Sequence, residues 1–210
     1  SYDFITQRQI GRRALVGSTE SNTPLIEDSY RRVLQIMQNR LARGDFMLGD
    51  RPGRGDFALY GQLTQLVHFD PTSMAIAVDV APKVVHWVDR MDDLSWLPVD
   101  EAGSDANGAN EGWSSIDDLD PAALELLEEV GRTYAPFLVA NARALMSGAD
   151  EVSCQIVGLD GARHEYRQAP FGYQGKCLQW LRDGYDELNE GDRTRVDAAL
   201  DGTGCEQLFE

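Results

Sequence analysis

The stretch of residues 46–63 constrains the fold more than any other part of the chain, because it joins an apolar anchor, a Gly/Pro turn and the start of a helix. The sequence FMLGDRPGRGDFALYGQL predicts a helix that begins near Gly53. Almost every side of this helix is apolar, and only a thin polar strip is left. The apolar residues are Phe57, Ala58, Leu59, Tyr60, Leu63, Leu66 and Val67. Such a helix favours a place in the middle of a helical bundle.

The start of this helix carries a structural cap formed by Gly53 and Asp56. Asp56 lies three residues after Gly53. A carboxylate at that position can accept a hydrogen bond from the backbone N–H of the capping residue, and it lies at the positive end of the helix dipole. We therefore expect Asp56 to hold the head of the helix in place.

The order of these elements resembles a known family. A Leu-Gly-Asp-x-Pro turn followed by Asp-Phe-Ala-Leu-Tyr-Gly is similar to the capping box and core helix of the glutathione S-transferase C-terminal domain. The family usually has Ser or Thr at the capping position, whereas this chain has Gly53, so the hydroxyl half of the box is missing. Glycine is a tolerated cap that costs a few tenths of a kcal/mol.

The neighbouring helices extend this resemblance over residues 1–97. Residues 24–43 have the clearest helical period, with Thr23 as the expected cap and one apolar stripe: Ile26, Tyr30, Val33, Leu34, Met37 and Leu41. A short segment follows at residues 70–80. A helix from Pro82 to Leu94 then has one apolar side: Val84, Trp87, Val88, Met91 and Leu94.

Residues 2–16 predict a first helix with two kinds of face. We expect its apolar residues to face inward: Phe4, Ile5, Ile10, Ala14 and Leu15. Arg8, Arg12 and Arg13 form a basic ridge at helical spacing, which is typical of a solvated face. The chain begins without Met and enters helical sequence at once, so we expect a further N-terminal part of the protein.

The second half of the chain matches no part of the family pattern. Residues 99–118 are acidic and rich in Gly, Asn and Ser, which predicts a linker. A helix follows from Asp120–Pro121, with Pro136 expected to kink or interrupt it. Helices at residues 173–188 and 193–200 end the chain.

The only strand signal lies near residues 151–168, where Asp160–Gly161 predicts a hairpin turn. A two-residue turn would place Cys154 and Ile156 on the face of Arg167 and Glu165. A shift of one residue would place His164 and Tyr166 there instead, and the sequence leaves both registers open.

These patterns predict a mainly α protein: a glutathione S-transferase C-terminal-type bundle followed by a helical extension with one β-hairpin. The expected organisation is a helical domain at residues 1–98, the acidic linker at 99–118 and the extension at 119–210. The extension is expected to pack on the bundle, because its apolar stripes need a partner.

Composition narrows the classes of partner. Asp and Glu outnumber Lys and Arg by 35 to 19, which gives a formal net charge of −16. This charge repels phosphate backbones and anionic lipids, so we expect neither nucleic acid nor membrane as a partner. The three cysteines have no metal-like spacing and indicate reduced thiols in a cytoplasmic protein, with no metal.

Candidate site residues come from the resemblance and from one cysteine. In the family, the first helix of this domain lines the cleft, which implies substrate-binding roles for Tyr2, Arg8 and Arg12. Cys177 is a candidate reactive thiol, because it is expected in the first turn of a helix beside Lys176. The competing interpretation is an inert buried thiol, since Cys177 also lies on an apolar stripe.

The resemblance implies that this chain is the C-terminal portion of a glutathione S-transferase-like protein. It would form the wall for a small electrophilic substrate, with glutathione as co-substrate, in a homodimer. No thioredoxin-like pattern is visible in the sequence, so no catalytic residue can be named and this chain alone is expected to be inactive. The alternative is a non-catalytic binding or scaffold protein built on the same helical fold.

Overall fold

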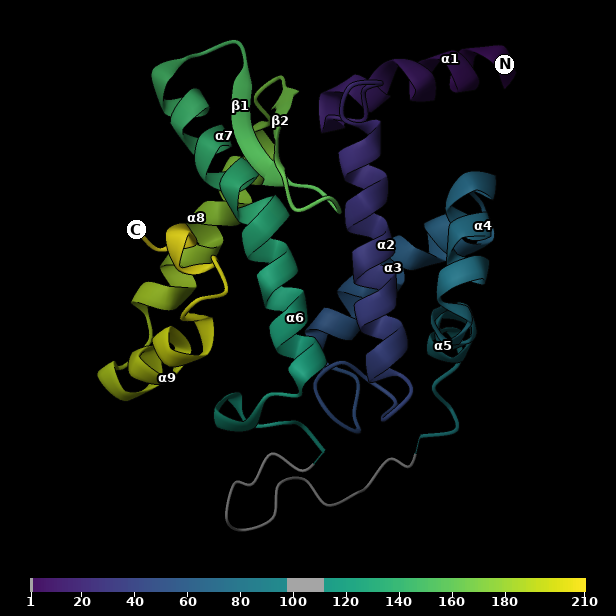
Figure 1. Cartoon of the computed structure of the whole chain (residues 1–210), viewed down its shortest axis with the longest axis vertical. Coiled ribbons are helices and arrows are strands. Elements are labelled where there is room, and N and C mark those ends of the chain that lie inside the picture. Colours follow the sequence, from purple (N-terminus) through teal and green to yellow (C-terminus); the bar gives the residue numbers. More distant parts are fainter. Residues whose placement is uncertain (1, 98–111) are drawn as a thin grey trace. The chain divides into compact units, whose positions relative to one another are not determined.

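The computed structural model describes residues 2–97 and 112–210 (Figure 1). Most of the predicted acidic linker therefore lies outside the described residues. The helices of the first half are α1 (Tyr2–Arg12), α2 (Thr23–Arg40), α3 (Arg54–His68), α4 (Pro71–Val80) and α5 (Pro82–Asp92). The second half contains α6 (Pro121–Glu129), α7 (Ala135–Ser147), β1 (Val152–Val157), β2 (Arg163–Gln168), α8 (Gly172–Asp186) and α9 (Glu190–Leu200).

The predicted fold class is confirmed: the described chain is mainly helical, with one antiparallel hairpin. It forms two compact units, one of residues 1–30 with 127–210 and one of residues 31–126. These units divide the chain differently from the expected ranges 1–98 and 119–210. The ranges 1–98 and 119–210 were predicted as the borders of the family domain and its extension, and in that sense they stay a prediction.

The unit of residues 31–126 is held by the apolar stripes of α2 and α5. The helical period selected six of the buried side chains of these helices: Leu34, Met37, Val84, Trp87, Val88 and Met91. It missed Leu25 and Ile36 of α2, which are buried, and it selected Ile26, which is 39% exposed. The indole Nε1 of Trp87 also donates to the carbonyl of Asp45 at 2.9 Å. Periodicity therefore found the core-facing side of α5 and only part of that of α2. Thr23 is the first residue of α2, and its hydroxyl donates back to the Thr19 carbonyl at 2.9 Å, so the expectation that Thr23 caps this helix was wrong.

Helix α3 is less buried than the sequence predicted. Its buried side chains are Asp56, Leu63 and Val67, whereas Phe57 is 50% exposed. The helix packs against α4 and α5. The prediction of a helix covered on all sides was wrong, because apolar composition does not fix how many neighbours a helix acquires.

Helix α1 also differs from its prediction. The α-helix ends at Arg12, and a 3₁₀ turn (η1, Arg13–Val16) leads to Gly17. No residue of α1 is buried, so the expectation that Phe4, Ile5, Ile10, Ala14 and Leu15 face inward was wrong. Among the described residues, nothing covers the apolar side of this helix.

The hairpin adopts the second of the two open registers. Cys154 pairs with Tyr166 and Ile156 with His164, and residues 158–162 form the loop. Val152, Ile156 and Tyr166 are buried against Phe137 of α7, and the Phe137 and Tyr166 rings meet edge to face with centroids 5.8 Å apart. The five-residue loop explains why a two-residue turn gave the wrong register.

The interruption expected at Pro136 is confirmed as a π-helical turn (η3, Val130–Tyr134) between α6 and α7. Within it, the backbone N–H of Ala135 donates to the carbonyl of Val130, five residues earlier. Proline lacks an N–H, and its ring clashes with the carbonyl four residues before it in a regular α-helix. The π turn is therefore the local solution to a proline near the start of α7.

Candidate functional site

The cap of α3 contains a fully buried carboxylate. Asp56 is 0% exposed; its Oδ2 accepts from the N–H of Gly53 at 2.9 Å, and its Oδ1 accepts from the N–H of Met47 at 2.8 Å. Gly53 precedes the first helical residue and has no side chain with which to complete a reciprocal box. Asp56 thus joins the turn before the helix to the head of the helix itself.

Tyr2, Arg8 and Arg12 all lie on α1 and are exposed, Tyr2 by 81%. Arg8 and Arg12 are four residues apart and share one side of the helix. None of the three forms a hydrogen bond or ion pair with the residues that the structure describes. Their guanidinium and phenol groups are therefore open to solvent and to a ligand.

Cys177 lies in the second turn of α8, not the first. The helix begins at Gly172, so the thiol is past the free backbone N–H groups of the helix end. The side chain is half-buried, and Lys176 beside it in sequence is exposed. Burial raises the pKa of Tyr134, and the neighbouring Cys177 raises it further. The reactive role of Cys177 stays a hypothesis.

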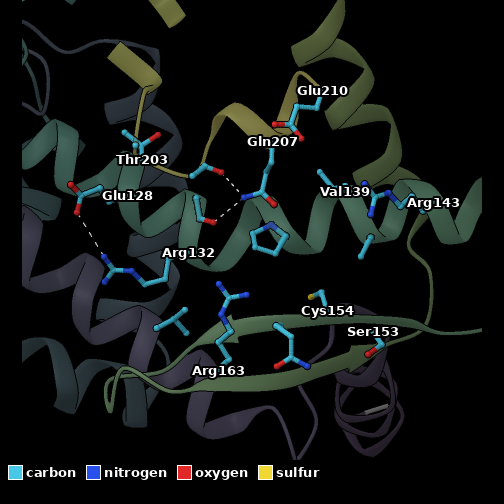
Figure 2. Close-up of a pocket in the computed structure, with 17 residues that line it drawn as sticks. Glu128, Arg132, Val139, Arg143, Ser153, Cys154, Arg163, Thr203, Gln207 and Glu210 are labelled. Atoms are coloured by element: carbon cyan, nitrogen blue, oxygen red, sulfur yellow. Dashed lines mark hydrogen bonds and ion pairs between the residues drawn. The ribbon is translucent and has the colours of Figure 1, made fainter. Parts of the chain in front are cut away.

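A pocket of about 860 Å³ lies in the unit of residues 1–30 and 127–210 (Figure 2). Its first wall is the π turn and α7, its second is the hairpin and its third is the segment after α9. The residues that matter for its chemistry are Arg132, Pro136, Val139, Ala140 and Arg143 on the first wall, Cys154 and Arg163 on the second, and Thr203, Gln207 and Glu210 on the third.

The third wall is fixed by close backbone packing on Gly131. A Cβ at Gly131 would lie 2.0 Å from the carbonyl oxygen of Thr203, so only glycine allows this approach. The Gln207 amide donates to the Gly131 carbonyl at 3.3 Å, and the Cys205 thiol donates to the Leu127 carbonyl at 3.1 Å. The segment after α9 is therefore a built wall of the pocket.

The charged lining is three arginines and two glutamates. Arg132 is shared between Glu128 at 3.8 Å and the buried Glu129 at 3.7 Å. Arg143 and Arg163 form no ion pair with any residue in the described ranges. By contrast Arg167, on the same strand as Arg163, pairs with Glu151 at 2.9 Å and with Glu165 at 2.7 Å.

Cys154 is the thiol that lines this pocket. Burial raises its pKa to about 11, and burial together with Cys154 raises the pKa of Tyr166 to about 12. Because the thiolate is the nucleophile, this raised pKa disfavours a nucleophilic role for Cys154 near neutral pH. Sequence reasoning did not find the pocket, since Arg143, Arg163 and Gln207 carry no motif that links them.

No group of three or more His, Cys, Asp or Glu in residues 2–97 and 112–210 could hold a metal ion. In the same ranges, no helix has the length and hydropathy needed to cross a membrane.

Comparison with known protein families identifies a helical domain within the first half of the chain. Residues 26–94 match the family model described as glutathione S-transferase, C-terminal domain. They include most of α2 and all of α3–α5. The chain therefore contains a helical domain of the glutathione S-transferase C-terminal type, which confirms the resemblance over this segment. Neither the curated proteins nor the solved structures gave a match.

Proposed function

We propose that this chain forms the electrophile-side wall of a glutathione-conjugation site in a glutathione transferase-like protein. The observation that supports the proposal is the family match over residues 26–94. Glutathione would be the co-substrate and the partner a small electrophile, in a cytoplasmic homodimer. In the family the first helix of the domain lines the cleft, and we propose α1, which lies before the matched residues 26–94, for that role.

The surface of α1 fits both parts of such a ligand. Tyr2, Phe4 and Ile5 expose apolar area on which an aromatic electrophile can pack. Arg8 and Arg12 present permanently charged guanidinium groups, which bind carboxylates of the kind that glutathione carries. We therefore assign substrate-binding roles to Tyr2, Arg8 and Arg12.

Conjugation also needs a donor that lowers the pKa of the glutathione thiol, because the thiolate is the attacking species. The family draws that donor from a thioredoxin-like domain, and no residue of this chain is assigned the role. We expect residues 1–210 to bind the conjugate without forming it. A conjugation assay with a chloronitrobenzene should then show no rate above that of the uncatalysed reaction.

A titration with dinitrophenyl-glutathione followed by ¹⁵N NMR tests the wall. The amide signals of α1 should shift, and Tyr2→Ala and Arg8→Gln should each raise Kd by about tenfold, because each removes a ring contact or a charge-assisted hydrogen bond. Arg195→Gln is the matched control on α9 and should change nothing. Unchanged α1 signals at saturating conjugate would refute the wall.

The alternative function, a non-catalytic binding or scaffold protein, is favoured by exposed apolar side chains on and between α3 and α4. Phe57, Phe69, Met74 and Val78 are between 40% and 71% exposed. Sedimentation equilibrium of the wild type and Phe57→Ser separates the two functions only together with the conjugate titration, because the first function is also proposed for a homodimer. Self-association that Phe57→Ser abolishes, without any binding of the conjugate, would support the scaffold.

A further inference from the structure

The pocket between α7, the hairpin and the segment after α9 is a candidate binding site outside the matched residues 26–94. We propose that it binds a small organic anion, whose charged group meets Arg143 or Arg163 and whose apolar body lies against α7. This site does not depend on the glutathione-conjugation wall.

The size of the pocket suits such a ligand. Its volume of about 860 Å³ lies in the range of small-molecule sites, roughly 300–1,000 Å³. Pro136, Val139 and Ala140 form an apolar strip along one wall. Binding sites commonly combine an apolar lining with a few polar groups that orient the ligand.

The charges in the pocket favour an anion. Arg163 extends from the hairpin wall and Arg143 lies on the α7 wall (Figure 2). Both guanidinium groups stay charged at any ordinary pH and lack a carboxylate partner among the described residues. The Glu210 side chain forms no ion pair among the described residues, while Arg182 donates to the main-chain oxygen of Glu210 at 3.1 Å. Glu128 is already engaged with Arg132.

The contrast with Arg167, on the same strand as Arg163, strengthens this inference. The chain carries 35 acidic and 19 basic residues. In such a chain carboxylates are plentiful, as the two partners of Arg167 illustrate. Two arginines without a partner at one pocket therefore leave donor groups free for an anion from outside. Arginine also binds carboxylate and phosphate groups in a planar, two-pronged geometry.

The fixed walls allow a ligand to bind without first ordering the site. Gly131 and the Gln207 and Cys205 hydrogen bonds hold the third wall, and the strand pairing holds the second. A preformed site avoids much of the entropy cost of binding. The apolar strip and the two arginines are therefore presented together.

Fluorescence titration with anilinonaphthalene sulfonate tests the site, with phenylnaphthylamine as the uncharged probe of similar apolar body. Arg143→Gln and Arg163→Gln should each raise Kd for the sulfonate by about tenfold, since each removes a charge-assisted hydrogen bond. The Kd for phenylnaphthylamine should not change. Arg13→Gln, an exposed arginine outside the pocket lining, is the matched control. Circular dichroism should show that all variants are folded.

A second measurement tests whether the sulfonate binds in this pocket. Alkylation of Cys154 by iodoacetamide at about pH 9 should slow when the sulfonate is bound, because the thiol lines the same pocket. Octanoate and octyl phosphate, with octanol as the neutral control, then show whether the bound anion is a carboxylate or a phosphate. Either anion displacing the sulfonate better than octanol supports the site.

Three results would overturn the proposal. One is a sulfonate Kd that neither pocket variant changes. Another is an equal loss of affinity for both probes, which would mean that charge plays no part. The third is a Cys154 alkylation rate that the bound sulfonate leaves unaltered.

Discussion

Asn141 binds both backbone groups of Phe171: its Nδ2 donates to the Phe171 carbonyl at 3.1 Å, and its Oδ1 accepts from the Phe171 N–H at 2.8 Å. Asn141 is 0% exposed on α7, and Phe171 is the residue directly before α8. A single buried amide therefore fixes where α8 starts relative to α7. No other hydrogen bond from a side chain caps this helix start in the described structure.

Replacing this amide should be costly. Asn141→Leu keeps the volume but leaves the N–H of Phe171 without its partner. The C=O of Phe171 loses the bond from Asn141 and still accepts from the Gln174 N–H at 3.1 Å, so we expect a loss of about 1–3 kcal/mol in the free energy of unfolding. Urea denaturation of the wild type and the variant measures this loss in the free energy of unfolding. Asn39→Leu, at an exposed position of α2, should stay within about 0.5 kcal/mol of the wild type. Equal midpoints for the two variants would contradict the role of Asn141.

The cap of α3 gives a second prediction. Asp56→Ala removes two hydrogen bonds from buried or half-buried N–H groups and should cost about 1–3 kcal/mol. Gly53→Ser should be stabilising by a few tenths of a kcal/mol, because a hydroxyl would complete the box. A Cβ at Gly53 lies no nearer than 3.6 Å to the surrounding atoms, so the serine fits. If the denaturation midpoint of Asp56→Ala equals that of the wild type, Asp56 does not stabilise the start of α3.

Two glycines in helical segments should respond in opposite directions to alanine. At Gly131 the added methyl meets the backbone of Thr203 and Gly204, so Gly131→Ala should displace the segment after α9 and speed its cleavage by protease. At Gly184 on α8 no atom lies within 4 Å of the added methyl, so Gly184→Ala should stabilise by up to about 1 kcal/mol. Limited proteolysis measures the cleavage of Gly131→Ala, and thermal melting measures the stability of Gly184→Ala, each against the wild type. A stable, protease-resistant Gly131→Ala would show that the wall can move aside.

Cys154 should make stability fall in alkaline solution. Burial raises the pKa of the Cys154 thiol from its usual value of 9.0, which applies to the unfolded chain, to about 11 in the folded protein. Between these values the unfolded chain has lost the thiol proton and the native chain keeps it, so rising pH favours unfolding; below them both states are protonated and the thiol contributes nothing. From pH 9 to 11 the wild type should lose about 2 kcal/mol more than Cys154→Ala. Ser153→Ala, a neighbouring variant with no titrating group, should follow the wild type.

Helical period predicted the parts of the fold that depend on one element at a time. The stripes of α2 and α5 selected Leu34, Met37, Trp87 and Val88, all of which are buried. Pro136 predicted an interruption because its effect is local and covalent. The hairpin was also visible, since alternation and Asp160–Gly161 lie within a few residues of each other.

Features that depend on tertiary neighbours could not be predicted from these patterns. The apolar residues of α1 looked inward-facing, yet burial requires a partner surface that the helical period does not reveal. The pocket needed two facts at once: the hairpin register that places Cys154 and the packing of Thr203 on Gly131. Neither is encoded in a short motif.

The π turn makes the pocket insensitive to a one-residue change in chain length. A π turn amounts to one additional residue in an α-helix, and its wider turn absorbs that residue, so the side chains that follow keep nearly the directions that they would have in an uninterrupted helix. Removing a single amino acid between Val130 and Tyr134 would therefore leave Val139, Arg143 and Asn141 close to their present sides of α7. It would instead bring the Pro136 ring against the carbonyl four residues before it, so the cost of a one-codon deletion would fall on the helix backbone and not on the pocket lining.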